Sequence, residues 1–148
     1  MREIAYIVIH CTATQPNQSI SSIKKYWKEV LGWSNPGYHL IIDAFGKVHK
    51  MLPFDGIANG AKGYNTRSIH MAYIGGIDKS GAAFDTRTPE QSIALAATIT
   101  VLKDMFLSSK IVGHRDLSPD LNSDGKITPD EFIKQCPSFD VSEWLKTI

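Results

Sequence analysis

The chain has 148 residues, of which 43% are hydrophobic and 21% charged, and its formal net charge is +1. This length suits one domain with one hydrophobic core, so we expect a single domain over residues 1–148. The balanced charge argues against a nucleic-acid polyanion or an anionic membrane as a partner. No apolar run approaches the roughly 18 residues of a membrane-spanning helix, and the run over residues 4–9 is too short for a signal peptide. We expect a monomer without membrane insertion, cytoplasmic until it is released or exported.

The first part of the chain predicts a central strand, a helix and a hairpin. Residues 4–10 are apolar on both faces and rich in β-branched side chains, which favours a strand covered on both sides. Residues 38–43 and 47–51 flank a tight turn and predict a β-hairpin. Between the first strand and the hairpin, the sequence predicts a helix over residues 19–31 that ends at Gly32. Its apolar stripe has the three- and four-residue spacing of a helix and consists of Ile20, Ile23, Trp27 and Val30.

The second part predicts two more strands and two helices. Residues 69–74 and 110–113 are strand-like, and a surface excursion over residues 78–87 separates the first of them from the next helix. That helix starts with Thr88 as N-cap, Pro89 at the first helical position and Gln91 in a capping box. Its core face consists of Leu95, Ile99, Leu102 and Phe106. Asp140 caps a final helix. The mixture predicts an α/β fold with one mixed sheet flanked by helices.

Three side chains that can bind a metal follow or precede predicted elements. His10 and His114 each end a strand, and Cys136 precedes the last helix. Two imidazoles and a thiolate are a usual catalytic zinc set, and three protein ligands leave the fourth position open for water. The three residues are widely spaced and no His-Glu-x-x-His motif is present. The pattern alone therefore leaves open whether the histidines are ligands or structural residues.

Cys11 is a second cysteine with a different expected place. Side chains alternate along a strand, so Cys11 faces away from a site that His10 faces. We expect a small buried residue rather than a disulfide partner of Cys136.

Six short motifs occur in order along the chain. They are residues 9–14 (IHCTAT), 37–42 (GYHLII), 61–65 (AKGYN), 74–78 (IGGID), 113–116 (GHRD) and 134–140 (KQCPSFD). Together they resemble the zinc-dependent N-acetylmuramoyl-L-alanine amidases of the phage lysozyme-amidase type, whose fold peptidoglycan recognition proteins share. The resemblance covers roughly residues 4 to 146.

This resemblance implies roles for five residues. His10, His114 and Cys136 correspond to the zinc ligands. Tyr38 corresponds to the tyrosine that contacts the zinc-bound water, and Lys134 to the lysine that stabilises the developing oxyanion. The implied substrate is peptidoglycan, and the implied reaction is hydrolysis of the amide bond between N-acetylmuramic acid and L-alanine of the stem peptide.

The chain departs from the family pattern at two positions. Asn59-Gly60 stands where the family often has a histidine, and Ser68-Ile69-His70 stands where it often has Ser-Ile-Gly. Both departures concern the substrate groove, and His70 has no assigned role. His39, which we expect on the opposite face from Tyr38, is interpreted as structural or as a support for the site.

Residues 120–131 match the calcium-loop pattern of EF-hand proteins. Oxygen donors fall at the required loop positions, with glycine at the sixth; they are Asp120, Asn122, Asp124 and Glu131. The flanks are poor, because Ser118-Pro119 leaves no long entering helix. A structural Ca²⁺ site and a self-bonded turn are both left open.

An amidase is the leading hypothesis, and two alternatives remain. One is a non-catalytic peptidoglycan-binding module, and the other is a regulator of a partner enzyme. Recognition proteins that only bind peptidoglycan commonly lack the cysteine ligand. This chain has Cys136 together with both histidines, Tyr38 and Lys134, which favours an enzyme.

Overall fold

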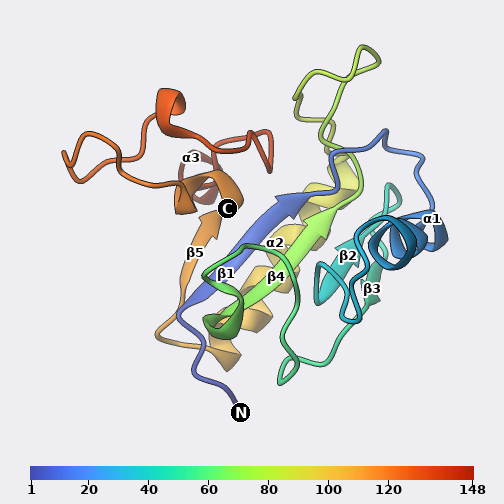
Figure 1. Ribbon diagram of the computed structural model, residues 1–148, viewed down its shortest axis with the longest axis horizontal. Helices are drawn as coiled ribbons and strands as arrows, with labels where there is room; N and C mark the ends of the chain where they lie inside the picture. Colours follow the sequence, from blue (N-terminus) through green and yellow to red (C-terminus); the bar gives the residue numbers. More distant parts are fainter.

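The computed structural model describes all 148 residues, which form a five-stranded sheet with helices on both faces (Figure 1). The strands are β1 (Tyr6–Cys11), β2 (Leu40–Ile42), β3 (Val48–Lys50), β4 (Ser68–Tyr73) and β5 (Lys110–Gly113), in the order β3-β2-β4-β1-β5. Strands β2, β4, β1 and β5 are parallel, and β3 pairs antiparallel with β2 as the predicted hairpin. The predicted α/β class with one mixed sheet is confirmed.

Helix α2 (Pro89–Met105) covers one face of the sheet, and its start is as predicted. Thr88 accepts the Gln91 N–H at 3.1 Å, and the Gln91 side chain accepts the Thr88 N–H at 2.9 Å. The helix buries Leu95, Ile99 and Leu102 in a cluster of 14 buried residues that also contains side chains of β1, β2 and β4. Helix α3 (Val141–Leu145), capped by Asp140 as predicted, completes this cluster with Val141. Full burial of one such aliphatic side chain contributes about 1.5–3 kcal/mol.

Helix α1 (Ile20–Lys25) and a single π-helical turn over Tyr26–Val30 lie on the opposite face. Ile23 and Trp27 pack against Ile41 and Ile74 there, as the apolar stripe predicts. Val30 is the exception, because 67% of it is exposed. The Leu31 N–H bonds to the Tyr26 carbonyl, five residues back. This turn holds more residues than an α-helical turn, which takes Val30 at its end out of the α-helical phase, so the prediction of Val30 as a core residue is wrong.

The carboxyl ends of four parallel strands meet at one edge of the sheet. At this edge β1 ends at Cys11 and β5 at Gly113, and the chain after β5 returns across it toward α3 (Figure 1). Crevices outside the carboxyl ends of strands are the usual ligand sites of such sheets. None of the helices combines the length and the apolarity that crossing a bilayer requires.

Candidate metal centre

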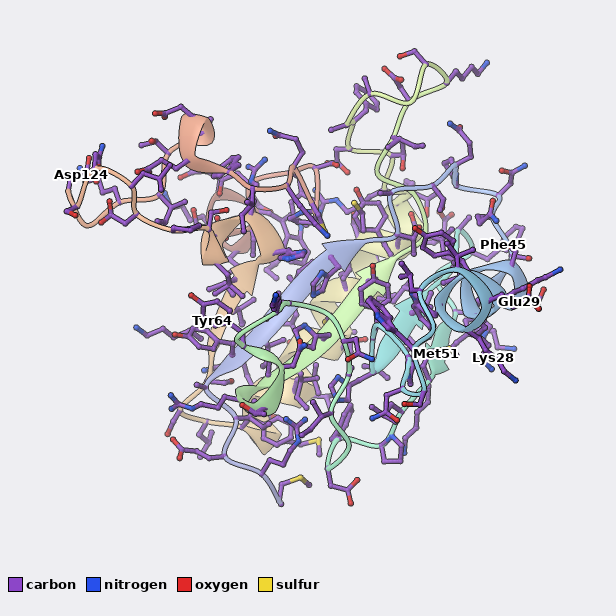
Figure 2. All side chains as sticks on the ribbon, viewed as in Figure 1. Lys28, Glu29, Phe45, Met51, Tyr64 and Asp124 are labelled. Atoms are coloured by element: carbon purple, nitrogen blue, oxygen red, sulfur yellow. The ribbon has the colours of Figure 1, made fainter.

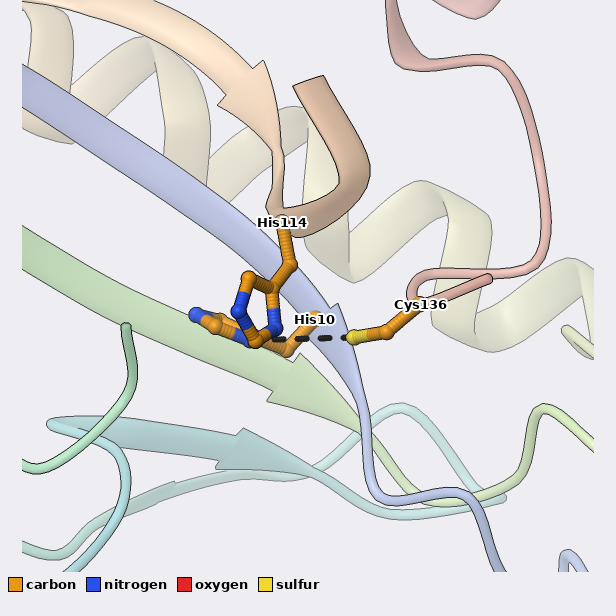
Figure 3. A group of neighbouring side chains, drawn as sticks. All are labelled: His10, His114 and Cys136. Carbon is orange, nitrogen blue, oxygen red and sulfur yellow. Dashed lines mark hydrogen bonds between the residues drawn. The ribbon is translucent and has the colours of Figure 1, made fainter. Parts of the chain in front are cut away.

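His10, His114 and Cys136 converge at this edge of the sheet (Figure 3). One ligand atom from each residue lies within 4.8 Å of the other two. His10 Nδ1 is 3.7 Å from Cys136 Sγ, and the rings of His10 and His114 are 4.7 Å apart between centroids. Residues from three distant parts of the sequence therefore form one cluster, as a three-ligand metal site requires.

The turn after β5 fixes His114. The Gly113 N–H donates to Asp116 Oδ2 at 2.7 Å, which closes the turn around His114. The next residue, Arg115, donates its backbone N–H to the Cys136 carbonyl at 2.8 Å. This bond ties the strand that delivers one ligand to the loop that delivers another.

The loop that carries Cys136 is held against β1 and β4. The Cys11 N–H donates to Cys136 Sγ at 3.3 Å, and the Tyr73 hydroxyl donates to the Pro137 carbonyl at 2.8 Å. A β-carbon added at Gly113 would lie 2.9 Å from Pro137 Cδ, so glycine is needed for this close approach. Cys11 itself is 3% exposed and belongs to the core cluster, against which Cys136 also packs, and both cysteines are free, as predicted.

The electrostatics of the cluster suit metal binding by the histidines. Burial, followed by the neighbouring His70, His114 and Lys134, lowers the pKa of His10 well below 6.5. Burial, followed by the charge of Lys134, lowers the pKa of His114 to about 4. Both imidazoles are therefore neutral near pH 7 and can offer a lone pair. Burial raises the pKa of the Cys136 thiol well above 9, so a metal ion must displace its proton. Two neutral imidazoles and one displaceable thiol proton are donors that zinc accepts readily.

The buried histidines predict an acid-sensitive metal-free protein. Burial lowers the pKa of His70 to about 3, and the pKa values of His10 and His114 are also lowered. In the unfolded chain each titrates near about 6.5, so below that pH the unfolded state binds more protons than the folded state. Stability is thus highest above pH 6.5 and falls toward pH 4, with a slope of up to about 1.4 kcal/mol per pH unit for each histidine.

Thermal melts of the metal-free protein between pH 7.5 and 4.5 measure this slope. His70→Leu removes one of these buried histidines and is expected to make the slope shallower. A melting temperature that stays constant over this range would contradict the prediction.

A groove of about 730 Å³ opens over the cluster. His10, His114 and Cys136 lie in its lining together with Tyr38 and Lys134. A second hollow of about 430 Å³ shares His114 and Lys134 and extends along the loop with the AKGYN motif, which includes Tyr64 (Figure 2). An extended substrate could pass over the cluster from one hollow to the other.

Tyr38 and Lys134 flank the cluster in different ways. The Tyr38 ring is 5.0 Å from the His10 ring, and its hydroxyl donates to the Cys11 carbonyl at 3.3 Å. Burial, followed by the nearby Cys136, raises the pKa of Tyr38 well above 10, so the phenol stays neutral. Lys134 is exposed at the groove, and its positive charge contributes to the lowered pKa of both His10 and His114.

Known proteins place the chain in a family. A family model described as N-acetylmuramoyl-L-alanine amidase matches residues 1–131. The chain belongs to this amidase family. The endolysin of Enterobacteria phage K11 is 31% identical over 147 residues, which cover 99% of this chain and 88% of that relative. As a family member the chain is an enzyme, an amidase of peptidoglycan.

Solved structures confirm the fold of the amidase. The Ph2119 endolysin of a Thermus scotoductus bacteriophage matches with a TM-score of 0.76 at 22% identity, covering 99% of this chain and 85% of that one. Bumblebee PGRP-SA matches with a TM-score of 0.70 at 19% identity, covering 99% of this chain and 82% of that one. The predicted similarity to both amidases and peptidoglycan recognition proteins is confirmed at the level of the fold.

Two further histidines of the amidase lie beneath the groove. His70 on β4 is fully buried, and its Nδ1 is 2.9 Å from His10 Nε2. His39 is also buried, and its ring stacks on that of His70 at 6.0 Å. Tyr38 and His39 precede β2, which begins at Leu40, so the expected alternation between their faces stays a prediction. The sequence indicated no role for His70, because strand periodicity predicts the face of the sheet on which a side chain lies but not the residue that it contacts.

The proposed calcium loop of the amidase projects away from the sheet, with Asp124 at its outer tip (Figure 2). Asp120 accepts backbone N–H groups of Asp124 and Gly125, and Glu131 accepts those of Leu121, Asn122 and Thr128. These hydrogen bonds match the self-bonded turn, which is one of the two alternatives that the sequence left open. Calcium binding by this loop stays a prediction.

Proposed function

We propose that the chain hydrolyses the amide bond between N-acetylmuramic acid and L-alanine in peptidoglycan with zinc as its cofactor, and that residues 1–148 form the catalytic domain. It acts on the cell wall, as an endolysin does. The observation that carries the zinc assignment is the convergence of His10, His114 and Cys136, whose ligand atoms lie within 4.8 Å of one another at a groove. Zinc held there would lower the pKa of a coordinated water toward about 7 and polarise the scissile carbonyl.

The residues of the chain supply positioning and charge. The neutral Tyr38 phenol lies beside His10 and can orient the attacking oxygen through its hydroxyl group. Lys134 stands two residues before Cys136 in the same loop and lines the groove, where its ammonium group can stabilise the negative charge that develops on the carbonyl oxygen. It forms no salt bridge within the chain, so its charge is available to a substrate.

Analysis of the reaction products tests the proposed bond. The purified protein is incubated with cell walls, and we expect new amino termini on L-alanine without new reducing sugars. Removal of the metal with a chelator should abolish the release, and added zinc should restore it. New reducing sugars would indicate a glycosidase, and binding to the walls without any release would indicate a recognition module; either result would refute the proposal.

A structural calcium ion is a separate prediction for Asp120, Asn122, Asp124 and Glu131. Binding to the folded state alone raises the free energy of unfolding by about 2.7 kcal/mol at 100 times the dissociation constant. We therefore expect millimolar calcium to raise the melting temperature, and Asp120→Asn to remove the rise. An unchanged melting temperature together with a flat calorimetric titration would leave the loop as a self-bonded turn.

A further inference from the structure

His70 occupies a place that the proposed mechanism does not use. Its ring is fully buried beneath the groove, and its Nδ1 lies 2.9 Å from Nε2 of His10. We propose that His70 is a positioning residue that fixes the ring orientation and the tautomer of His10 for metal binding. This inference rests on the proposed zinc site.

The two ring nitrogens of His10 face different partners. Nδ1 faces Cys136 Sγ at 3.7 Å, and Nε2 faces His70. A nitrogen that binds a metal offers its lone pair, so the ring proton of a neutral imidazole then resides on the other nitrogen. With Nδ1 toward the metal, the proton is on Nε2 and needs an acceptor, which Nδ1 of His70 provides. Such a bond holds a ligating ring in place and raises its basicity.

His70 is itself held in place by His39. The backbone N–H of His70 donates to His39 Nδ1 at 3.0 Å, and the two rings stack at an angle of 14°. Because His39 Nδ1 accepts this bond, its ring proton is on Nε2, which donates to the Gly56 carbonyl at 3.0 Å. The loop at Gly56 is thus connected through His39 and His70 to the proposed ligand His10.

Gly60 provides the room for the His70 ring. A β-carbon added at Gly60 would lie 2.4 Å from both Cγ and Nδ1 of His70, a distance that no side chain tolerates. The backbone of Gly60 does not have a positive φ, so the glycine is needed for space rather than for conformation. The two departures from the family pattern, Gly60 and His70, are therefore one feature: an imidazole on β4 fills the space that the glycine leaves.

The hydrogen bonding of His70 also favours a role beyond packing. Its Nε2 is buried and has no hydrogen-bond partner. When Nδ1 accepts from His10, this Nε2 carries an unpaired proton, which destabilises the fold. An aliphatic side chain would fill the same space without an unpaired buried proton. The hydrogen bond to His10 offsets the destabilisation that this proton causes.

Zinc affinity in three variants tests the proposal. His70→Asn keeps an acceptor atom the same number of bonds from the backbone as Nδ1. His70→Gln moves the amide group one bond farther out, and His70→Leu removes the acceptor at similar volume. Dissociation constants are measured by competition with a chromophoric chelator, and the visible spectrum of the Co²⁺-loaded protein reports the ligand geometry. We expect His70→Leu and His70→Gln to weaken zinc binding by about 10- to 100-fold and to change the Co²⁺ spectrum. We expect His70→Asn to stay close to the original protein.

The outcomes separate this inference from the zinc site itself. Circular dichroism checks folding, and if His70→Leu does not fold, the difference between His70→Asn and His70→Gln decides. If all folded His70 variants have equal affinities and spectra and His10→Ala abolishes binding, the role of His70 is refuted and the zinc site stands. If His10→Ala also binds zinc normally, the zinc site and this inference both fail.

A double-mutant cycle tests the link to Gly60. Gly60→Ala displaces the His70 ring, so we expect it to weaken zinc binding in the original protein. In a His70→Gly background the space is empty, and the same change is expected to have little effect. Equal effects in the two backgrounds would overturn the coupling between Gly60 and His70.

Discussion

Replacement of Cys136 by serine is expected to abolish hydrolysis of cell walls and to weaken zinc binding by more than about 100-fold. Loss of a group that merely orients a ligand costs about 10- to 100-fold, and Cys136 is itself one of three proposed ligands. The serine hydroxyl can still accept the N–H of Cys11, which donates to Sγ at 3.3 Å. The metal-free variant should therefore keep its fold.

Zinc content by mass spectrometry and the clearing of a cell-wall suspension measure the two losses. Cys11→Ala is the control for loss of a cysteine, because Cys11 is the other free cysteine and lies beside Cys136 but contributes no ligand atom to the metal cluster. We expect this control to bind one zinc ion per chain. Clearing by Cys136→Ser at the rate of the original protein would refute the zinc mechanism.

Local sequence signals predicted the elements that carry the site. The capping box of Thr88 and Gln91 and the cap at Asp140 depend on bonds between near neighbours, so the sequence reveals them directly. The apolar run of β1 likewise predicted a central strand that ends near His10. For the metal ligands, spacing alone was insufficient; the order of six motifs made His10, His114 and Cys136 one set, and the structure brings them together.

Features that depend on contacts between distant residues could not be predicted in this way. Nothing in the sequence near His70 indicates that Gly60 leaves room for its ring or that His10 is its partner. The π-helical turn that exposes Val30 is similar, because the spacing of a short apolar stripe does not show where one wider turn replaces an α-helical turn. Such features are decided by which packing arrangement fills the space best.

Replacement of Lys134 by alanine is expected to lower the rate of amide hydrolysis by about 10²- to 10³-fold while zinc binding is kept. A group that stabilises an oxyanion typically contributes a factor of this size. Lys134 contributes no ligand atom to the metal cluster, and its positive charge opposes any cation near His10 and His114. Removal of this charge should therefore leave zinc affinity unchanged or slightly higher, so the variant separates catalysis from metal binding.

Lys110→Ala is the charge-matched control for this experiment. Lys110 is exposed at the start of β5, and the site lies beyond the other end of that strand. Both variants lose one positive charge, so an effect of net charge on attraction of an anionic substrate would lower both rates equally. Steady-state rates on a soluble muropeptide, together with zinc affinity, distinguish the cases. If Lys134→Ala and Lys110→Ala are slowed equally, Lys134 acts through long-range attraction only. If Lys134→Ala alone is slow and binds zinc normally, its ammonium group acts on the reacting carbonyl.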